Sequence, residues 1–201
     1  MDQFDLEVHP SVYPPSEDSF LLYDSVSIDS SDVVLDMGCG AGILALKAAK
    51  LGKQVVAVDV SWDAVANTEF NLARNNLSHK CTVIQSDLTS AIDDSARFSL
   101  IACNPPYVPA SDDRTQLDHA LVGGKVGIEF TLRLIAAVRP HLIDGGSMYL
   151  VVTSIGNFDL ITEKMAKEGL SVERIARRRM FFEELSVLRG RVQEDYKETV
   201  L

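Results

Sequence analysis

Ile101-Ala102-Cys103-Asn104-Pro105-Pro106-Tyr107 is the stretch around which the chain is organised. The apolar run from Phe98 to Cys103 predicts a buried parallel strand. The two prolines that follow it lack a backbone N–H and hold φ at about −65°. A residue before a proline is also kept out of the helical region, so Asn104 cannot begin a helix. The stretch therefore predicts a stiff elbow at the carboxyl end of a central strand, the end at which open α/β sheets bind ligands.

The elbow presents groups that suit a planar, conjugated NH2 group. The Asn104 side-chain oxygen can accept one of its N–H bonds, and the backbone carbonyl after it can accept the other. The Tyr107 ring can cover the flat face. A proline-rich turn with no special role is the alternative, but Asn104 and Tyr107 directly after a strand favour the functional interpretation. The candidate catalytic residues are therefore Asn104, Pro105 and Tyr107.

Length and composition favour one α/β domain over residues 1–201, with an N-terminal arm over 1–15 and a tail over 194–201. Hydrophobic residues make up 46% and charged residues 24%, which is ordinary for a soluble globular protein. No apolar run approaches the length of a membrane span, and the first residues do not resemble a signal peptide.

Cysteines and net charge restrict the function further. The three cysteines form no CxxC pair, so neither a disulfide framework nor a metal site is predicted, and we expect a cytoplasmic protein. The net charge of −10 argues against binding to nucleic-acid phosphates as the main function. It does not exclude such binding, because Arg174 and the run Arg177–Arg179 form a local basic segment.

A glycine-rich turn follows the first predicted strand in Val33-Val34-Leu35-Asp36-Met37-Gly38-Cys39-Gly40-Ala41-Gly42, and a helix is predicted over Ile43–Leu51. Gly38 and Gly40 allow the backbone to turn tightly and to approach a ligand closely. The third glycine of a dinucleotide fingerprint would fall at position 43, where this sequence has isoleucine. Asp36 is poorly placed to meet a pyrophosphate and well placed to hold a cationic group, such as the amino group of a methionine moiety.

Asp59 ends the second predicted strand, Val55–Asp59. An acid at this place hydrogen-bonds both hydroxyls of a ribose, and the spacing from Gly38 suits one β-α-β unit that holds an adenosine. The alternative is that Asp59 caps the next helix, which begins near Ser61-Trp62-Asp63. The preceding glycine turn favours the ribose role.

Asp87 and Leu88 follow the third predicted strand, Cys81–Gln85. Asp87 is placed to bind the exocyclic amine of adenine with Leu88 against the ring, and a simple turn is an equal alternative. Three strands thus end in carboxylates and the fourth in the elbow, all at one edge of a sheet. This convergence carries more weight than any single motif.

The rest of the chain continues the alternation of helices and strands. A helix begins at Ser16, with its hydroxyl as the cap and acids in the first turn, and runs to about Val26. Its Ser19 either faces a ligand or belongs to a helix that only covers the sheet. Further predictions are a helix containing Phe130 to Val138, a strand over Ser147–Val152, a helix over Phe158–Lys167, and antiparallel strands over Val172–Arg179 and Leu185–Val192. The order predicts a doubly wound, mostly parallel seven-stranded sheet with a C-terminal antiparallel hairpin.

With its D-x-G-x-G-x-G turn, the chain resembles the class I, Rossmann-like methyltransferases, and the Asn104-Pro105-Pro106-Tyr107 motif (NPPY) resembles those that methylate amino groups. It is most similar to the HemK/PrmC-type N5-glutamine methyltransferases, in their short archaeal and eukaryotic branch. The likeness rests also on Val12–Phe20, on Gly123-Gly124 with Gly127 near by, and on Glu184–Arg189. It covers most of residues 12–190.

The resemblance implies S-adenosylmethionine as cofactor. It places Asp36, Gly38 and the adjoining Gly40 at the methionine part with Ser19 near by, Asp59 at the ribose, and Asp87 with Leu88 at the adenine. Asn104 would hold the target amide, assisted by Pro105 and Tyr107.

The resemblance also implies a substrate and a partner. The substrate is a translation release factor, methylated on the glutamine of its Gly-Gly-Gln loop. The partner is a small zinc-binding activator protein, which would add to the sheet edge near Thr82-Val83-Ile84. The alternatives are methylation of adenine N6 or guanine N2 in nucleic acid, methylation of a protein lysine, and a non-catalytic subunit that only binds the cofactor.

Overall fold

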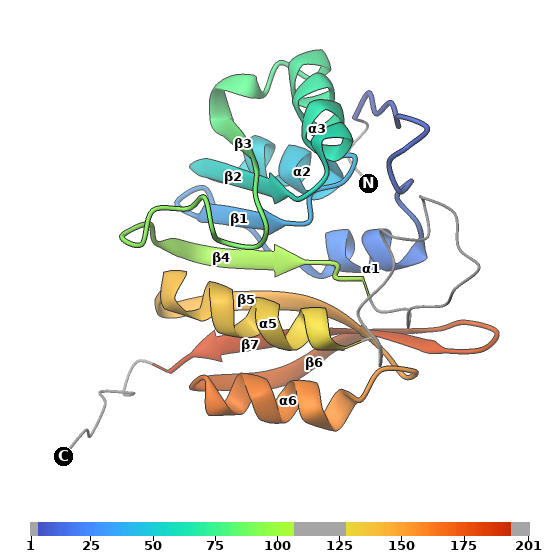
Figure 1. The fold of residues 1–201 in the computed structure, drawn as a ribbon, viewed down its shortest axis with the longest axis vertical. Helices are drawn as coiled ribbons and strands as arrows, with labels where there is room; N and C mark the ends of the chain where they lie inside the picture. Colours follow the sequence, from blue (N-terminus) through green and yellow to red (C-terminus); the bar gives the residue numbers. More distant parts are fainter. Residues whose placement is uncertain (1–3, 107–127, 194–201) are drawn as a thin grey trace.

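The computed structural model describes residues 4–106 and 128–193 of the chain (Figure 1). These residues form a seven-stranded sheet in the order β3-β2-β1-β4-β5-β7-β6. The strands are β1 (Val33–Met37), β2 (Gln54–Asp59), β3 (Cys81–Gln85), β4 (Phe98–Cys103), β5 (Leu142–Thr153), β6 (Leu170–Arg179) and β7 (Glu184–Val192). Tyr107 and the glycines at 123, 124 and 127 lie outside the described residues, as does the predicted tail over 194–201.

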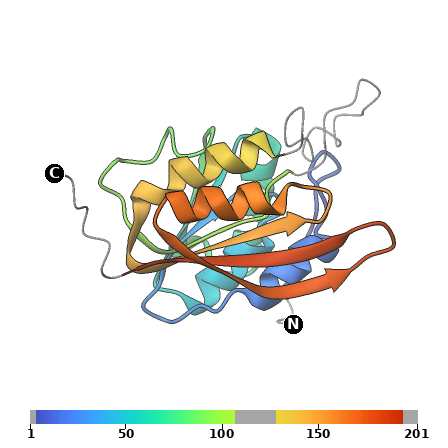
Figure 2. The ribbon, with the colours of Figure 1, turned by 90° about the horizontal axis from the view of Figure 1, so that it is seen from below.

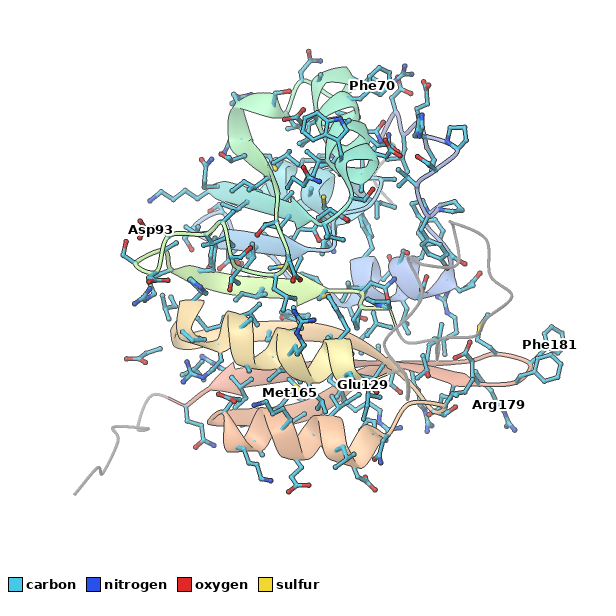
Figure 3. The ribbon with its side chains drawn as sticks, in the orientation of Figure 1. Phe70, Asp93, Glu129, Met165, Arg179 and Phe181 are labelled. Atoms are coloured by element: carbon cyan, nitrogen blue, oxygen red, sulfur yellow. The ribbon has the colours of Figure 1, made fainter. Side chains whose placement is uncertain are left out.

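The pairing of the strands confirms the predicted sheet. Strands β1 to β5 run parallel to one another, whereas β7 is antiparallel to both of its neighbours, β5 and β6. The hairpin between β6 and β7 turns at Met180 and Glu183, whose backbones are hydrogen-bonded at 2.8 Å. Phe181 is fully exposed at the tip of this hairpin (Figure 3).

Helices cover both faces of the sheet, as expected for a doubly wound fold (Figure 2). The helices are α1 (Glu17–Ser25), α2 (Ile43–Leu51), α3 (Trp62–Arg74), α5 (Glu129–Val138) and α6 (Phe158–Lys167), with short 3-10 turns η1 (Ser78–Lys80) and η2 (Arg139–His141). Helices α5 and α6 lie together on one face, and α1 and α2 lie on the other.

The central strands are apolar on both sides because both faces are buried. In β1, Leu35 packs with the residues of α5 and α6, whereas Val34 packs with those of α1 and α2. In β4, Ile101 packs on the face of α5 and α6, and Ala102 packs on the face of α1 and α2. This alternation explains why the sequence shows continuous apolar runs at these strands rather than a polar-apolar pattern.

Two local predictions are wrong. Strand β5 begins at Leu142 rather than at Ser147, because the segment with Gly145 and Gly146, which reads as a turn, continues the strand after a shift in its register against β4. Ser16 occupies the N-cap of α1, but its side chain makes no capping hydrogen bond. A capping Ser16 hydroxyl would accept the backbone N–H of Ser19. That N–H instead donates a hydrogen bond to Asp18 Oδ1 at 2.7 Å.

No helix among the described residues is long and apolar enough to cross a membrane. The N-terminal segment over residues 4–15 contains no regular helix or strand.

The packing of β7 against α6 predicts the effect of a substitution at Gly190. A Cβ built at Gly190 lies 2.5 Å from Met165 Cε and 3.2 Å from Leu170 Cβ, and Met165 is fully buried between α6 and the sheet (Figure 3). We expect Gly190→Ala to lower the free energy of unfolding by about 1–3 kcal/mol, measured by urea denaturation. Gly156→Ala is the matched control, because its Cβ meets no atom closer than 3.4 Å. Equal stabilities of the two variants would contradict this packing.

Candidate active site

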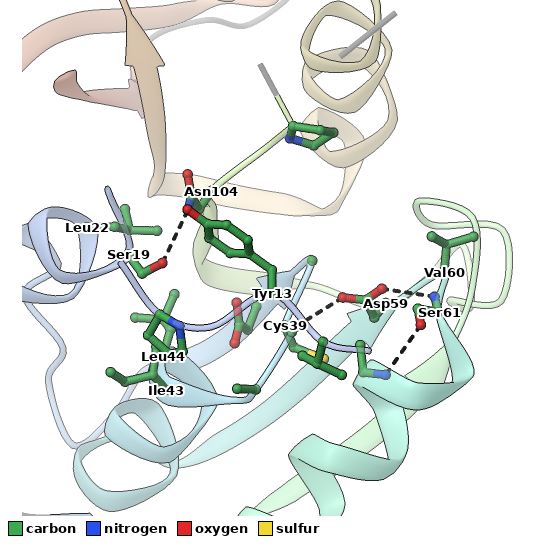
Figure 4. Close-up of a pocket in the computed structure, with 18 of the residues that line it drawn as sticks. Tyr13, Ser19, Leu22, Cys39, Ile43, Leu44, Asp59, Val60, Ser61 and Asn104 are labelled. Atoms are coloured by element: carbon green, nitrogen blue, oxygen red, sulfur yellow. Dashed lines mark hydrogen bonds between the residues drawn. The ribbon is translucent and has the colours of Figure 1, made fainter. Parts of the chain in front are cut away.

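A cavity of about 550 Å³ opens at the carboxyl ends of the four strands β1 to β4 (Figure 4). Its volume lies within the range of small-molecule sites, about 300–1,000 Å³. The sequence-predicted residues that line it are Ser19, Asp36, Gly38, Gly40, Asp59, Asp87 and Asn104. The structure thus brings together residues from four strand ends and from α1.

Two predicted residues lie elsewhere. Leu88 packs in the core cluster on the α5 face and does not line the cavity. Its φ of +51° turns the backbone sharply after Asp87, which separates the two side chains. Pro105 is buried and does not line the cavity, whereas the next residue of the elbow, Pro106, does. Tyr107 lies outside the described residues.

Asp36 is the most buried acid of the cavity, with 3% of its surface exposed. Its Oδ2 atom is buried without a hydrogen-bond partner among the described residues. Burial raises the pKa of Asp36 to about 7, with a smaller raising effect from the neighbouring Asp59, while a backbone hydrogen bond from Ala45 lowers it. A buried carboxylate with a free oxygen is stabilised by a cationic hydrogen-bond donor, so this position suits an ammonium group.

Asp59 connects the end of β2 to the glycine turn. Its Oδ2 accepts a hydrogen bond from Gly40 N at 3.0 Å, and its Oδ1 accepts one from Ser61 N at 2.9 Å. Burial raises the pKa of Asp59, whereas these backbone donors lower it. The alternative role as a helix cap is filled by Ser61, whose Oγ accepts a hydrogen bond from Ala64 N at the start of α3. A carboxylate has about four lone-pair sites, so Asp59 can accept a ligand hydroxyl besides its backbone donors Ser61, Gly40 and Val60.

The glycine turn requires its glycines for two different reasons. Gly38 and Gly40 have φ of +79° and +53°, which side chains rarely allow, although a Cβ would meet nothing there. At Gly42 space is also limiting, because a Cβ would lie 3.0 Å from the side chain of Thr68. Thr68 Oγ1 in turn donates a hydrogen bond to the carbonyl of Gly40 at 2.9 Å, which fixes the turn against α3.

Asn104 stands at the predicted elbow, directly after β4. Its Nδ2 donates a long hydrogen bond of 3.5 Å to Ser19 Oγ, which comes from α1 (Figure 4). Its Oδ1 atom is buried without a hydrogen-bond partner among the described residues. The elbow therefore holds an acceptor that a donor from a ligand can satisfy.

Asp87 lies at the outer edge of the cavity. Its carboxylate pairs with Arg133 of α5 at 3.2 Å, and both side chains are more than half exposed. An exposed pair of this kind contributes little, about 0–1 kcal/mol, so it can exchange for a ligand. Arg133 was not predicted as a neighbour, since it lies more than forty residues away in the sequence.

The sequence by itself did not predict which residues form the apolar walls of the cavity. Val12 and Tyr13 come from the N-terminal arm, Leu44 from α2, and Phe130 from the first turn of α5. In the view of Figure 4, Tyr13 lies on the side of Ser19 and Asn104, across from Val60 and Ser61. The sequence pattern predicts Phe130 as an ordinary core residue of a helix, and no local signal distinguishes it as a residue that lines a cavity. Only the Tyr13-Pro14-Pro15 sequence could have indicated a fixed segment of the arm.

Comparisons with known proteins assign the chain to a family. Residues 16–181 match the methyltransferase small domain family. A putative protein N5-glutamine methyltransferase of Methanocaldococcus jannaschii is 34% identical over 187 residues, which is 91% of this chain and 93% of the relative. A release factor glutamine methyltransferase of Rhodopirellula baltica is 35% identical over 130 residues, 60% of this chain and 44% of the relative.

Among solved structures, the chain is similar to one from E. cuniculi, the Mtq2-Trm112 complex that methylates the eRF1 translation termination factor. The TM-score is 0.70 at 22% identity, and the match covers 91% of this chain and 99% of the other. At this level of identity the likeness concerns the fold.

The raised pKa of Asp36 predicts a pH dependence of stability. The pKa is 3.8 for an ordinary aspartate and about 7 in the folded chain, so the folded state binds more protons between these values. The free energy of unfolding therefore falls as the pH rises from about 4 to about 7. Asp36→Asn removes this contribution, so the variant gains stability relative to the parent over the same range. Urea denaturation at several pH values measures the difference, and parallel pH profiles would exclude this assignment.

Proposed function

The chain belongs to the HemK-type N5-glutamine methyltransferases within the methyltransferase small domain family, and from this we propose that it methylates a release factor. The methyl group passes from S-adenosylmethionine to the side-chain amide nitrogen of a glutamine, the glutamine of the Gly-Gly-Gln loop. The observation that carries the proposal is the free Oδ1 of Asn104, buried in the same cavity as Asp36 and Asp59.

The volume and the lining residues of the cavity suit the cofactor. The unpartnered Oδ2 of Asp36 suits the ammonium group of the methionine part, with Gly38 and Gly40 allowing close approach and Ser19 near by. Asp59 would bind the ribose hydroxyls, and Asp87 the adenine amine. Leu88 is left out of this assignment, because its side chain packs in the core and it does not line the cavity. When bound, S-adenosylmethionine supplies an electrophilic methyl group on a sulfonium.

The residues of the elbow orient the acceptor. An amide NH2 is a weak nucleophile because its lone pair is delocalised, so catalysis depends on position and on exclusion of water. Asn104 Oδ1 accepts one N–H of the glutamine amide, and the backbone carbonyl of the elbow accepts the other. Pro105 holds the elbow stiff. The role of Tyr107 over the flat face of the amide stays a prediction from the resemblance, because this residue lies outside the described residues. The nitrogen gains a methyl group and releases a proton, which is acidic enough after methylation to leave without a strong base.

A partner protein on the sheet edge belongs to the same proposal. Strand β3 is at one edge of the sheet, with no strand beyond Thr82-Val83-Ile84 in the described part of the chain. An edge strand has free backbone groups that can pair with another chain. We propose that a small zinc-binding activator adds there, and that the enzyme acts in the cytoplasm on release factors.

Asn104→Ala tests the role of the elbow. We expect kcat to fall by about 100-fold or more, because the amide loses the acceptor that orients it. The affinity for S-adenosylmethionine, measured by calorimetry, should stay within a few-fold of the parent. Ser19→Ala is the matched control: it removes the 3.5 Å partner of Asn104 Nδ2 but leaves Oδ1 in place, so its kcat should fall much less. Undiminished turnover in Asn104→Ala would refute the role.

A transfer assay with labelled cofactor identifies the substrate class. Release factor, the same factor with its Gly-Gly-Gln glutamine changed to alanine, tRNA, DNA and a lysine-rich protein are offered side by side, each with and without the candidate activator. We expect label in the release factor alone, and only when its glutamine is present. The net charge of −10 disfavours the nucleic acids. Label in tRNA or DNA would replace the proposal with nucleobase methylation, and label in lysine with lysine methylation.

A further inference from the structure

The N-terminal arm lies along α3 in an extended form. Residues 4 to 9 alternate strictly in exposure: Phe4, Leu6 and Val8 are partly buried in the core clusters, whereas the residues between them are exposed. This period of two is that of a β-strand. The arm has no strand partner among the described residues, so its backbone groups must bond to something else.

The backbone of the arm bonds to asparagine side chains of α3 and of its C-cap residue, Asn75. Asn75 Oδ1 accepts from Asp5 N at 3.0 Å, and its Nδ2 donates to Asp5 O at 2.9 Å. Asn71 binds both backbone groups of Glu7 in the same way, at 2.9 and 2.8 Å. Each carboxamide thus replaces the neighbouring strand that a sheet would supply.

These side-chain hydrogen bonds to the backbone of the arm form a ladder, and Asn67 extends it toward the cavity. Its Oδ1 accepts from His9 N at 2.9 Å and its Nδ2 donates to Glu7 O at 2.8 Å. Four residues of helix rise about 6.0 Å, and two residues of strand about 6.7 Å. The spacing of the asparagines along α3 therefore matches every second residue of the arm, which is why successive bonds can form without strain.

The ladder is continuous with the wall of the cavity. The carbonyl of His9 accepts a hydrogen bond from Val12 N at 2.9 Å, and Ser11 Oγ donates to Asp63 on α3 at 2.6 Å. Val12 is buried against Ala41 and Ala64, so it is fixed between the glycine turn and α3. Ser11, Val12 and Tyr13 all line the cavity. The arm is thus docked immediately before it forms that wall.

We propose that Asn67, Asn71 and Asn75 are positioning residues for cofactor binding, acting through the arm. The cavity is complete only while the arm is docked, so loss of ladder bonds lowers the fraction of binding-competent molecules and weakens the apparent affinity in proportion. The inference rests on the proposed cofactor cavity. The asparagines touch neither cofactor nor substrate, so the chemical step at saturating cofactor is unaffected.

The test changes the arm rather than α3, because Asn71 also donates to the carbonyl of Ala41 at 2.8 Å and its removal would disturb the fold. Glu7→Pro deletes the N–H that Asn71 accepts, and Glu7→Ala is the matched control that loses the same exposed side chain but keeps the N–H. His9→Pro and His9→Ala form a second pair for the bond to Asn67. The double variants combine the two positions.

We expect the double proline variant to bind S-adenosylmethionine about 5- to 30-fold more weakly than the double alanine variant, since each lost bond is worth about fivefold. The KM for the cofactor should rise equally, with kcat at saturating cofactor within twofold. Affinities within twofold of each other would overturn the inference. A fall in kcat together with an unchanged KM would assign the arm to the chemical step instead. Absence of cofactor binding in the parent chain would instead refute the proposed function, which keeps the two failures distinct.

Discussion

The in-register parallel pairing of β1 with its two neighbours is the constraint on which the site depends. Asp36 pairs with Ala57 on one side and with Ala102 on the other. Asp59 and Asn104 each come two residues after those partners, and an even offset keeps side chains on one face of a strand. A slip by one residue would turn one of the three away from the cavity. The register of the strands thus brings Asp36, Asp59 and Asn104 together at one place.

The same arrangement leaves polar atoms of the cavity unsatisfied. Asp36 Oδ2 and Asn104 Oδ1 are buried acceptors without partners among the described residues, which opposes folding. Burial also raises the pKa of Asp36 to about 7, so the carboxylate changes charge near neutral pH. The surrounding apolar strands and helices maintain these positions, and a ligand with donors in the right places relieves the cost. This separation of a rigid core from an unsatisfied site is typical of binding and catalytic centres.

Prediction from the sequence succeeded where a local pattern decides the conformation. The apolar run of β4 and the glycines after β1 fixed the strand ends, and three of the predicted acids line one cavity. It failed where a competing contact decided the outcome. Asp18 took the N–H that Ser16 would have capped, and the positive φ of Leu88 turned its side chain into the core. The first competition lies within the short segment Ser16–Ser19, where two side chains can accept the same N–H, whereas the second depends on packing against the core.

The sequence by itself determined the class of fold, the ends of the central strands and the polar residues at those ends, because each follows from short-range hydrophobic periodicity and from the steric limits of glycine and proline. Only the tertiary structure decided which apolar residues close the cavity and how the arm is held. Tyr13, Phe130 and the asparagines of α3 meet across large sequence separations. Such contacts depend on the packing of whole elements, which no local pattern encodes.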